Sequence, residues 1–196
     1  LTREGVAALP SRDKKFGTSY SIILVSPDGE RTILDYRGAS QYLRKGEVPF
    51  HKLKARWAYI SPGHIDYKVM WAIVKHCKAG HMKIAMNPSS FYINMGAKKL
   101  APMLKNLDVI LMNREEAGYL THARYHEEKK IFQKFDELVQ GIAVMTDGPK
   151  GVVVSDGKRI YSAGIFKEKE VVDRTGAGDA FGSGFVAGLI HSQKGK

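Results

Sequence analysis

The sequence contains one cysteine, no long apolar run and fewer acidic than basic residues. Because Cys77 has no second cysteine to pair with, a disulfide within the chain is impossible, and we expect a reducing, cytoplasmic compartment. No apolar stretch has the length that a membrane-spanning helix needs, and residues 1–15 lack the apolar core of a secretion signal. We therefore expect no membrane partner.

Positive charge dominates, with 31 Lys and Arg against 20 Asp and Glu and a formal net charge of +11. Such an excess fits either a nucleic-acid partner or an anionic small-molecule substrate. The basic residues are scattered and often stand beside acidic ones, as in EEKKIFQK (127–134). No recognisable nucleic-acid-binding motif accompanies them, so we expect a solvated surface with a general attraction for phosphates and no nucleic-acid partner.

Patterns typical of strands and helices alternate along a chain whose 196 residues are enough for one sizeable domain. A β-hairpin is predicted over 19–34, with its turn at Pro27-Asp28-Gly29. Further strands are predicted at 57–61, 83–88, 108–113 and 141–148, helices at 67–80, 96–107, 126–139 and from 114 onward, a second hairpin at 151–163, and a last helix from Ala180. This order predicts an α/β fold with a mostly parallel sheet flanked by helices.

Polar segments follow directly on three of the predicted strands. They are MNPSS (86–90), MNREE (112–116) and MTDGPKG (145–151). Ligands of parallel sheets bind at the carboxyl ends of the strands, so we expect a binding site where these three segments meet.

The segment VVDRTGAGDAFGSGFVAGL (171–189) gathers glycines at the start of the last predicted helix. Ordering a glycine costs backbone entropy, so packing alone does not favour so many. A helix N-terminus attracts anions through its unpaired N–H groups and its dipole, and the missing side chains let a phosphate reach the backbone. Asp179, in the first turn, would accept a proton from an attacking hydroxyl. The alternative is that Asp179 complements the helix dipole and the glycines permit close packing.

This segment resembles the C-terminal signature of the ribokinase-like, or PfkB, family of carbohydrate kinases, D-T-x-G-A-G-D-x-F. It matches the signature except at Arg174, where the family usually has Thr. Other segments resemble the family in the expected order. DVILMNREEAGYL (108–120) is similar to the N-x-x-E segment, VMTDGPKGVVV (144–154) to the T-x-G-x-x-G nucleotide loop, and residues 17–40 to the β-rich lid.

The resemblance implies a role for each matching residue. Asp179 would be the general base that activates a sugar hydroxyl for attack on the γ-phosphate of ATP. The backbone of Gly176, Ala177 and Gly178 would form an anion hole for the developing negative charge.

The resemblance also implies the residues that hold the cofactors. Asn113 and Glu116 would help to place Mg²⁺ and its waters near the phosphates. The nucleotide would contact the loop formed by Thr146, Asp147, Gly148, Pro149, Lys150 and Gly151. Asp173 and the carbonyl of Thr175 correspond to positions that hold a monovalent cation, often K⁺, and Gly38-Ala39 correspond to the end of the lid beside the substrate.

Simpler interpretations exist for several of these residues. Asn113 and Glu116 have the spacing of a helix capping box. Residues 146–148 could form an ordinary turn between strands. His122 and His126, four residues apart, have no third ligand nearby, which does not favour a metal site. Cys77 lies in an apolar helix pattern, typical of a core position.

Two features depart from the family pattern. Arg174 would add positive charge beside the anion hole, where it could contact a phosphate or disturb the cation site. The chain also lacks the Gly-rich N-terminal segment that grips the sugar and the C-terminal helices that enclose adenine. We therefore expect residues 1–196 to form a partial domain, with a lid at about 17–40 and an α/β core with the nucleotide-binding half at about 55–196.

The predicted function is that of an ATP-dependent carbohydrate kinase, similar to ribokinase, fructokinase or 2-keto-3-deoxygluconate kinase. A nucleoside kinase of the same fold and a non-catalytic nucleotide- or sugar-binding relative stay open as alternatives. The partners expected are a small sugar and ATP. The lid often mediates dimers in relatives, so a homodimer through residues 17–40 is a further expectation.

Overall fold

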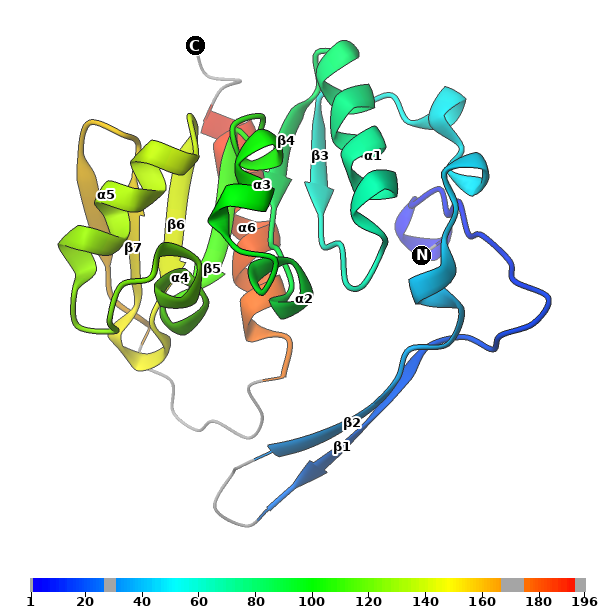
Figure 1. Cartoon of the computed structure of the whole chain (residues 1–196), viewed down its shortest axis with the longest axis horizontal. Helices are drawn as coiled ribbons and strands as arrows, with labels where there is room; N and C mark the ends of the chain where they lie inside the picture. Colours follow the sequence, from blue (N-terminus) through cyan, green and yellow to red (C-terminus); the bar gives the residue numbers. More distant parts are fainter. Residues whose placement is uncertain (1, 27–30, 167–174, 193–196) are drawn as a thin grey trace.

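The fold, given by a computed structural model, contains a separate two-stranded hairpin and a six-stranded sheet with helices on both faces (Figure 1). The structure describes residues 2–26, 31–166 and 175–192. The predicted hairpin turn at 27–29 lies outside these residues, but the two strands that it joins pair antiparallel as expected, from Tyr20↔Tyr36 to Val25↔Arg31.

The predicted strands and helices occur in the predicted order with small shifts in their bounds, and one further short helix, α2, was not predicted. The strands are β1 (Tyr20–Val25), β2 (Arg31–Tyr36), β3 (Trp57–Ile60), β4 (Lys83–Met86), β5 (Val109–Asn113), β6 (Ile142–Thr146), β7 (Val152–Ser155) and β8 (Ile160–Ala163). The α-helices are α1 (Tyr67–Ala79), α2 (Ser90–Ile93), α3 (Ala97–Leu104), α4 (Arg114–Thr121), α5 (Glu128–Leu138) and α6 (Ala177–Ser192). Short 3₁₀ helices occupy Thr2–Glu4, Gly38–Tyr42, Lys45–Glu47, Phe50–Lys52 and Gly148–Lys150.

The central sheet is mixed, and its strands lie in sequence order from β3 to β8. The pairs from β3 to β6 are parallel, which confirms the predicted α/β sheet for this part. The second predicted hairpin, β7–β8, extends the sheet with antiparallel pairs. Among the described residues, no helix has the length and apolar character needed to span a membrane.

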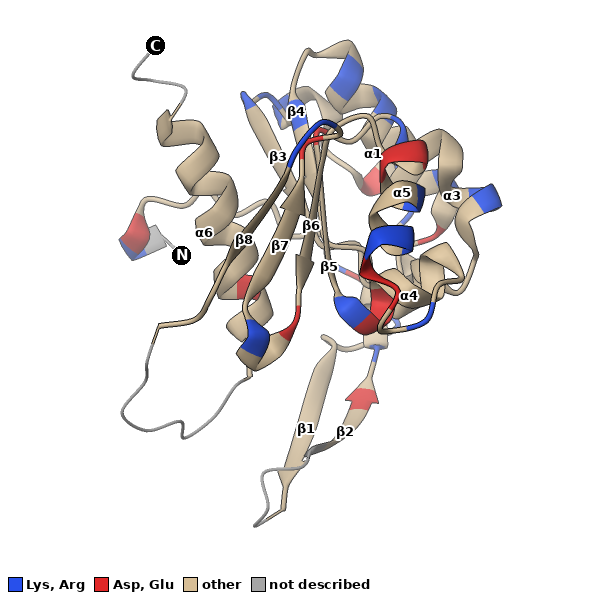
Figure 2. Ribbon diagram, turned by 90° about the vertical axis from the view of Figure 1, so that its left-hand side faces the viewer, with Lys and Arg blue, Asp and Glu red and all other residues tan. Residues whose placement is uncertain are grey.

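Strand residues alternate between two apolar cores, one on each face of the sheet. Ile84, Met86, Ile110 and Met112 belong to the larger core, which includes residues of α1 to α5. Ala85, Val109, Leu111 and Val144 face the other way and pack with Val186 of α6. Figure 2 shows the result: α6 covers one face of the sheet alone, and the other helices cover the opposite face.

The last helix differs from its prediction in two respects. It begins at Ala177, three residues before the predicted start, because the backbone already turns helical after Gly176 and Ala180 N–H donates to the Gly176 carbonyl. The glycines were also expected to let α6 pack closely on a neighbour. Gly182 does so, because it lies against Tyr59. A Cβ added at Gly184 or Gly188 would meet nothing within 4 Å in the described structure.

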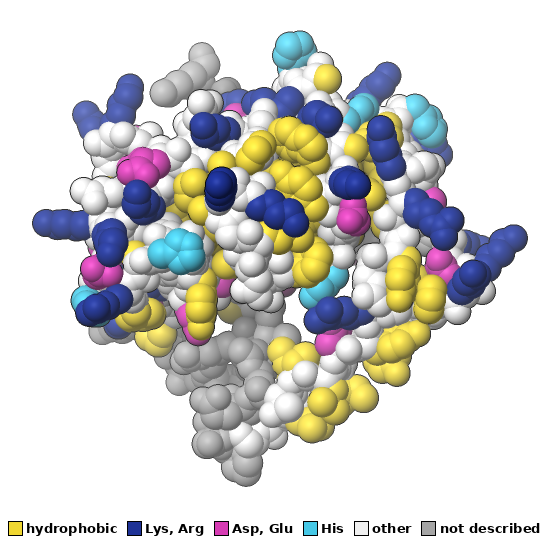
Figure 3. Space-filling view, in the orientation of Figure 1, with side chains coloured by type: hydrophobic (Ala, Val, Ile, Leu, Met, Phe, Trp, Pro, Cys, Tyr) yellow, Lys and Arg dark blue, Asp and Glu magenta, His cyan; other side chains and the backbone are white. Residues whose placement is uncertain are grey.

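The hairpin β1–β2 projects beyond the edge at which the parallel strands end (Figure 1). Its apolar side chains are largely exposed, including Tyr20 at 60%, Ile22 at 50% and Leu34 at 53%. In the space-filling view they lie open on the hairpin, and Lys and Arg side chains are dispersed over the visible face of the α/β core (Figure 3).

Candidate active site

The candidate site lies at the edge where β3, β4, β5 and β6 end and α6 begins (Figure 1). The parallel register places polar residues side by side at this edge, since Asn113 at the end of β5 pairs with Thr146 at the end of β6. Asn87 directly follows β4, and its backbone N–H donates to the carbonyl of Ile60 at the end of β3. The three polar segments predicted to meet are therefore brought to one edge.

The start of α6 presents bare backbone to solvent. Gly176 has φ of 80°, a conformation that side-chain-bearing residues rarely adopt, and it directs the chain into the helix. A Cβ at Gly176 or Gly178 would meet nothing within 4 Å in the described structure, and Gly176, Ala177 and Gly178 are exposed. The first-turn N–H groups of a helix have no partner within it, so this end is suited to an anion.

Asp179 stands in the first turn of α6 and is exposed. Its charge acts on Tyr59 of β3, whose pKa is raised first by burial and then by the negative charge of Asp179. A hydrogen bond from the Asn87 side chain acts in the opposite direction and lowers the pKa of Tyr59. Asp179 therefore lies at the carboxyl ends of β3 and β4, on the α6 side of the sheet.

Asn113 and Glu116 form the capping box that their spacing predicts. The Asn113 side chain accepts from the Glu116 N–H at 2.8 Å, and Glu116 Oε2 accepts from the Asn113 N–H at 2.9 Å. Burial raises the pKa of Glu116, Glu115 raises it further, and the bond from Asn113 lowers it. The capping box fixes both oxygen-bearing side chains at the end of β5, which is compatible with a second role toward a metal ion.

The loop after β6 closes into a tight 3₁₀ turn, with Pro149 in its first turn. The N–H of Asp147 donates to the carbonyl of Gly151 at 2.8 Å. Gly151 has φ of 90°, and a Cβ there would lie 2.1 Å from the carbonyl oxygen of Ala163. Only glycine therefore fits where this loop meets the end of β8.

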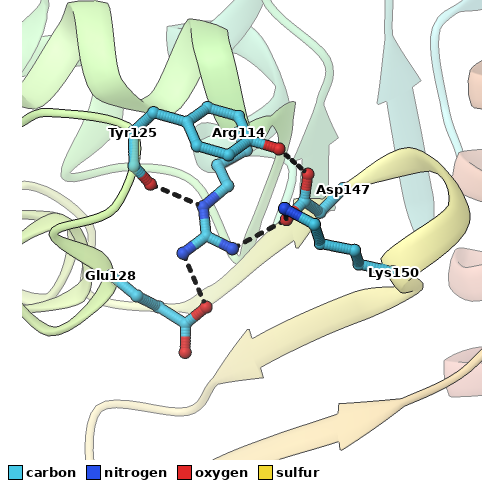
Figure 4. Close-up of polar contacts among 5 residues, drawn as sticks. All are labelled: Arg114, Tyr125, Glu128, Asp147 and Lys150. Carbon is cyan, nitrogen blue, oxygen red and sulfur yellow. Dashed lines mark hydrogen bonds and ion pairs between the residues drawn. The ribbon is translucent and has the colours of Figure 1, made fainter.

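An ion-pair cluster unites this loop with α4 and α5 (Figure 4). The guanidinium of Arg114 contacts Asp147 at 2.7 Å and Glu128 at 2.9 Å, and its Nε donates to the carbonyl of Tyr125 at 2.8 Å. The Tyr125 hydroxyl donates to the other oxygen of Asp147, and Lys150 lies 3.8 Å from the carboxylate.

The cluster is partly withdrawn from water, because the side chains of Arg114 and Asp147 are 12% and 8% exposed. Burial acts to raise the pKa of Asp147, but the hydrogen bonds from Tyr125 and Arg114 outweigh it, and the pKa is lowered. Asp147, expected to contact the nucleotide, is thus engaged by protein partners, whereas Lys150 is 66% exposed.

The base of the lid meets the α/β core at Gly38-Ala39. Gly38 is buried with φ of 47°, and a Cβ there would lie 2.3 Å from the Gly17 carbonyl oxygen. The N–H of Ala39 donates to that same oxygen at 2.9 Å. Ala39 lines a cavity of about 400 Å³ that also reaches Ile65 in the loop after β3. Gly38 therefore shapes the base of the lid, and Ala39 faces the open space.

The remaining predicted positions have mixed outcomes. Asp173 and Arg174 lie outside the described residues, and Thr175 is exposed in the turn before α6. His122 ends α4 and His126 precedes α5, so the two do not share a helix face, and no group of three potential ligands occurs among the described residues. Cys77 is buried in α1, as predicted.

Two residues of the site carried no signal in the sequence. Tyr59 lies in a short strand, where one aromatic residue is ordinary packing. Arg114 stands between the two motif residues of N-x-x-E, and its partners Tyr125, Glu128 and Asp147 come from separate elements. Only the folded structure brings these residues together.

The family is established by comparison with known proteins. The chain belongs to the pfkB family of carbohydrate kinases, which matches residues 1–196. It is 28% identical over 192 residues to the cytidine kinase of Thermococcus kodakarensis, covering 96% of this chain and 65% of that protein.

Two solved structures share the ribokinase-like fold. A probable sugar kinase from Rhizobium etli aligns with a TM-score of 0.82 and 24% identity, over 93% of this chain and 57% of that one. Ribokinase from Cryptococcus neoformans in complex with ADP aligns with a TM-score of 0.72 and 21% identity, over 92% of this chain and 62% of that one. The chain thus spans less than two thirds of the length of each of these relatives.

Replacing Arg114 with Met should lower the free energy of unfolding by about 3 kcal/mol, because the mostly buried carboxylate of Asp147 would lose its guanidinium partner. Lys130→Met is the matched control: it removes an exposed pair with Glu127 and should cost about 0.5 kcal/mol or less. Urea denaturation of both variants measures the difference. Equal losses would show that the cluster does not hold the loop to α4.

Proposed function

We propose that this chain carries the catalytic centre of an ATP-dependent carbohydrate kinase, which transfers the γ-phosphate of ATP to a sugar hydroxyl. One observation carries the proposal. The exposed start of α6 brings unpaired backbone N–H groups and the carboxylate of Asp179 to the edge where β3 to β6 end. An anion-binding backbone beside a proton acceptor is what transfer to an alcohol requires.

The chemical step follows from this arrangement. The acceptor hydroxyl lies beside Asp179 and gives up its proton to the carboxylate as its oxygen attacks the γ-phosphorus. The bond between the γ-phosphorus and the bridging oxygen breaks, and ADP leaves. The N–H groups at Gly176, Ala177 and Gly178 stabilise the negative charge that develops on the transferring group.

The nucleotide is held by the loop from Thr146 to Gly151, with unequal roles for its residues. Asp147 shapes the loop, since Arg114 and Tyr125 engage its carboxylate. Lys150 is the exposed cation of this loop and reaches the phosphates. Gly148 and Gly151 give the turn its left-handed backbone, with φ of 49° and 90°.

Asn113 and Glu116 are proposed to place Mg²⁺, which would offset the charge of the ATP phosphates when bound. An amide oxygen and a carboxylate suit this hard cation, which keeps several waters as ligands. The capping box holds both side chains in place for this task. A monovalent cation, K⁺ in many relatives, is proposed at Asp173 and the Thr175 carbonyl.

The sugar is proposed to bind between the lid base and the sheet edge. The cavity beside Ala39 is lined mainly by residues 9–19 and 39–47, and it reaches the α/β core at Ile65. Asp179 does not line it, so the sugar would lie between this cavity and the start of α6. The lid would cover the acceptor and exclude water from the transfer.

We further infer that the lid mediates a homodimer. Tyr20, Ile22 and Leu34 share one face of the hairpin, since Ile22 pairs with Leu34 and Tyr20 with Tyr36. Such an exposed apolar face is typical of an interaction surface. A cytoplasmic location and the absence of membrane and nucleic-acid partners remain part of the proposal, supported by the single buried Cys77 and the dispersed basic residues.

Asp179→Asn in the complete protein should lower kcat by about 100- to 10,000-fold, the usual contribution of a general base, with ATP affinity and stability close to wild type. Glu137→Gln, which removes an exposed carboxylate on α5, is the matched control and should leave kcat unchanged. Coupled ADP-release assays measure the rate. Near-normal turnover by Asp179→Asn would overturn the assignment of the base.

The similarity to a cytidine kinase over 96% of the chain favours a second candidate, a nucleoside kinase. A panel of ribose, fructose, 2-keto-3-deoxygluconate, cytidine and adenosine separates the two, and we expect a free sugar to give the highest kcat/KM. Turnover of nucleosides alone would decide for the second candidate. A protein that binds ATP and turns over no acceptor would be the non-catalytic relative.

Ile22→Glu should convert the dimer to monomers, because each interface would bury a carboxylate without a partner. The same substitution at Ile23, on the opposite face of the hairpin, is the control and should leave the dimer intact. Light scattering coupled to size-exclusion chromatography gives the masses. A monomeric wild-type protein would refute the lid interface.

A further inference from the structure

Tyr59 occupies an unusual position between the sheet and α6. It lies on the same side of β3 as Trp57, which packs into the core beneath α6. A Cβ added at Gly182 would lie 2.3 Å from the Tyr59 hydroxyl oxygen and 3.3 Å from Cζ. The phenol therefore fills the space that any side chain at position 182 would need, and it sets how closely this turn of α6 approaches the sheet.

The contact lies directly below the proposed catalytic turn. Gly182 follows Asp179 by three residues, and residues with this spacing lie on the same side of a helix, one turn apart. Tyr59 is 36% exposed, and its hydroxyl end packs against α6 at Gly182. The phenol thus contacts the helix one turn from the carboxylate.

Two polar side chains, those of Asp179 and Asn87, act on the Tyr59 hydroxyl. The pKa of Tyr59 is raised by burial and by the charge of Asp179, and lowered by the Asn87 side chain. The net increase keeps the phenol protonated at neutral pH, so Tyr59 is a neutral neighbour that adds no second negative charge beside Asp179.

We propose that Tyr59 is a positioning residue: by packing on Gly182 it fixes the first turn of α6, and with it the carboxylate of Asp179, at the ends of β3 and β4. This inference rests on the proposed function, because the placement matters for turnover only if Asp179 is the base. The packing of Tyr59 on Gly182 involves no residue of the loop from Thr146 to Gly151. A substitution of Tyr59 should therefore lower the rate of phosphate transfer and leave ATP binding unchanged.

The first test compares Tyr59→Phe with wild type in the complete protein. Loss of the hydroxyl removes the group that packs over Gly182 and should lower kcat by about 10- to 100-fold, with the KM for ATP within twofold. Tyr161→Phe, on the exposed strand β8, is the matched control and should keep full kcat. Unchanged kcat in Tyr59→Phe would overturn the proposal.

The second test uses the close packing of the Tyr59 hydroxyl on Gly182. Gly182→Ala should lose more activity than Tyr59→Phe, because its methyl group would overlap the phenol oxygen. Adding Tyr59→Phe to Gly182→Ala should restore part of the lost activity and of the thermal stability, since the overlapping atom is gone. Additive losses in the double variant would contradict the contact.

A third measurement does not depend on activity. With ¹³C-labelled tyrosine, the NMR titration of Tyr59, assigned with Tyr59→Phe, should show a lower pKa in Asp179→Asn than in wild type, because the negative charge has been removed. An unchanged pKa of Tyr59 in Asp179→Asn would show that the Asp179 carboxylate does not lie near the phenol. If Asp179→Asn is inactive but Tyr59→Phe is fully active, the positioning role fails and Asp179 stands as the base. If Asp179→Asn keeps near-normal turnover, the assignment of Asp179 as the base fails. If the wild-type protein turns over no acceptor, the proposed function fails.

Discussion

The position of α6 depends on its packing against one face of the sheet, and the candidate site depends on α6. Gly182 and Val186 are the buried residues of this helix, whereas Ala177 to Ala180 are exposed. The first turn therefore has no packing of its own and takes its place from the turn that follows. A helix held in this way keeps its N–H groups open to a ligand while its middle stays fixed on the strands.

The other half of the site is fixed by polar interactions. The loop from Thr146 to Gly151 contains two glycines with positive φ and no residue of either apolar core, so packing alone defines it poorly. The ion pairs of Arg114 with Asp147 and Glu128 connect this loop to α4 and α5. Apolar packing of α6 thus orients Asp179 at the ends of β3 and β4, and ion pairs orient the loop from Thr146 to Gly151 at the end of β6.

Much of the fold could be predicted from the sequence, because periodicity and turn residues are local properties. Gly80 illustrates this: the helix predicted to stop there ends at Ala79, with Gly80 as its C-cap. The Asn113 and Glu116 pair could be predicted for the same reason, since a capping box lies within four consecutive residues. The early start of α6 was missed because Gly176, Ala177 and Gly178 resemble a loop when their tertiary contacts are unknown.

The site was predictable only where the motif residues are contiguous. Thr146 to Gly151 and Gly176 to Asp179 could be located by pattern. The partners of Arg114 lie 11 to 33 residues away in the chain, and the phenol that meets Gly182 comes from β3. Such contacts between distant segments arise from strand register and helix placement, which no short pattern encodes.

The sequential strand order has a consequence for synthesis of the protein. Each strand from β4 to β8 pairs with the strand made just before it, so the sheet can grow as the nascent chain leaves the ribosome. The surface formed by Ala85, Val109, Leu111 and Val144 stays uncovered until α6 emerges and docks on it. The helix that covers this apolar surface also carries Asp179, so a chain that ends before α6 would expose the surface and lack the proposed base.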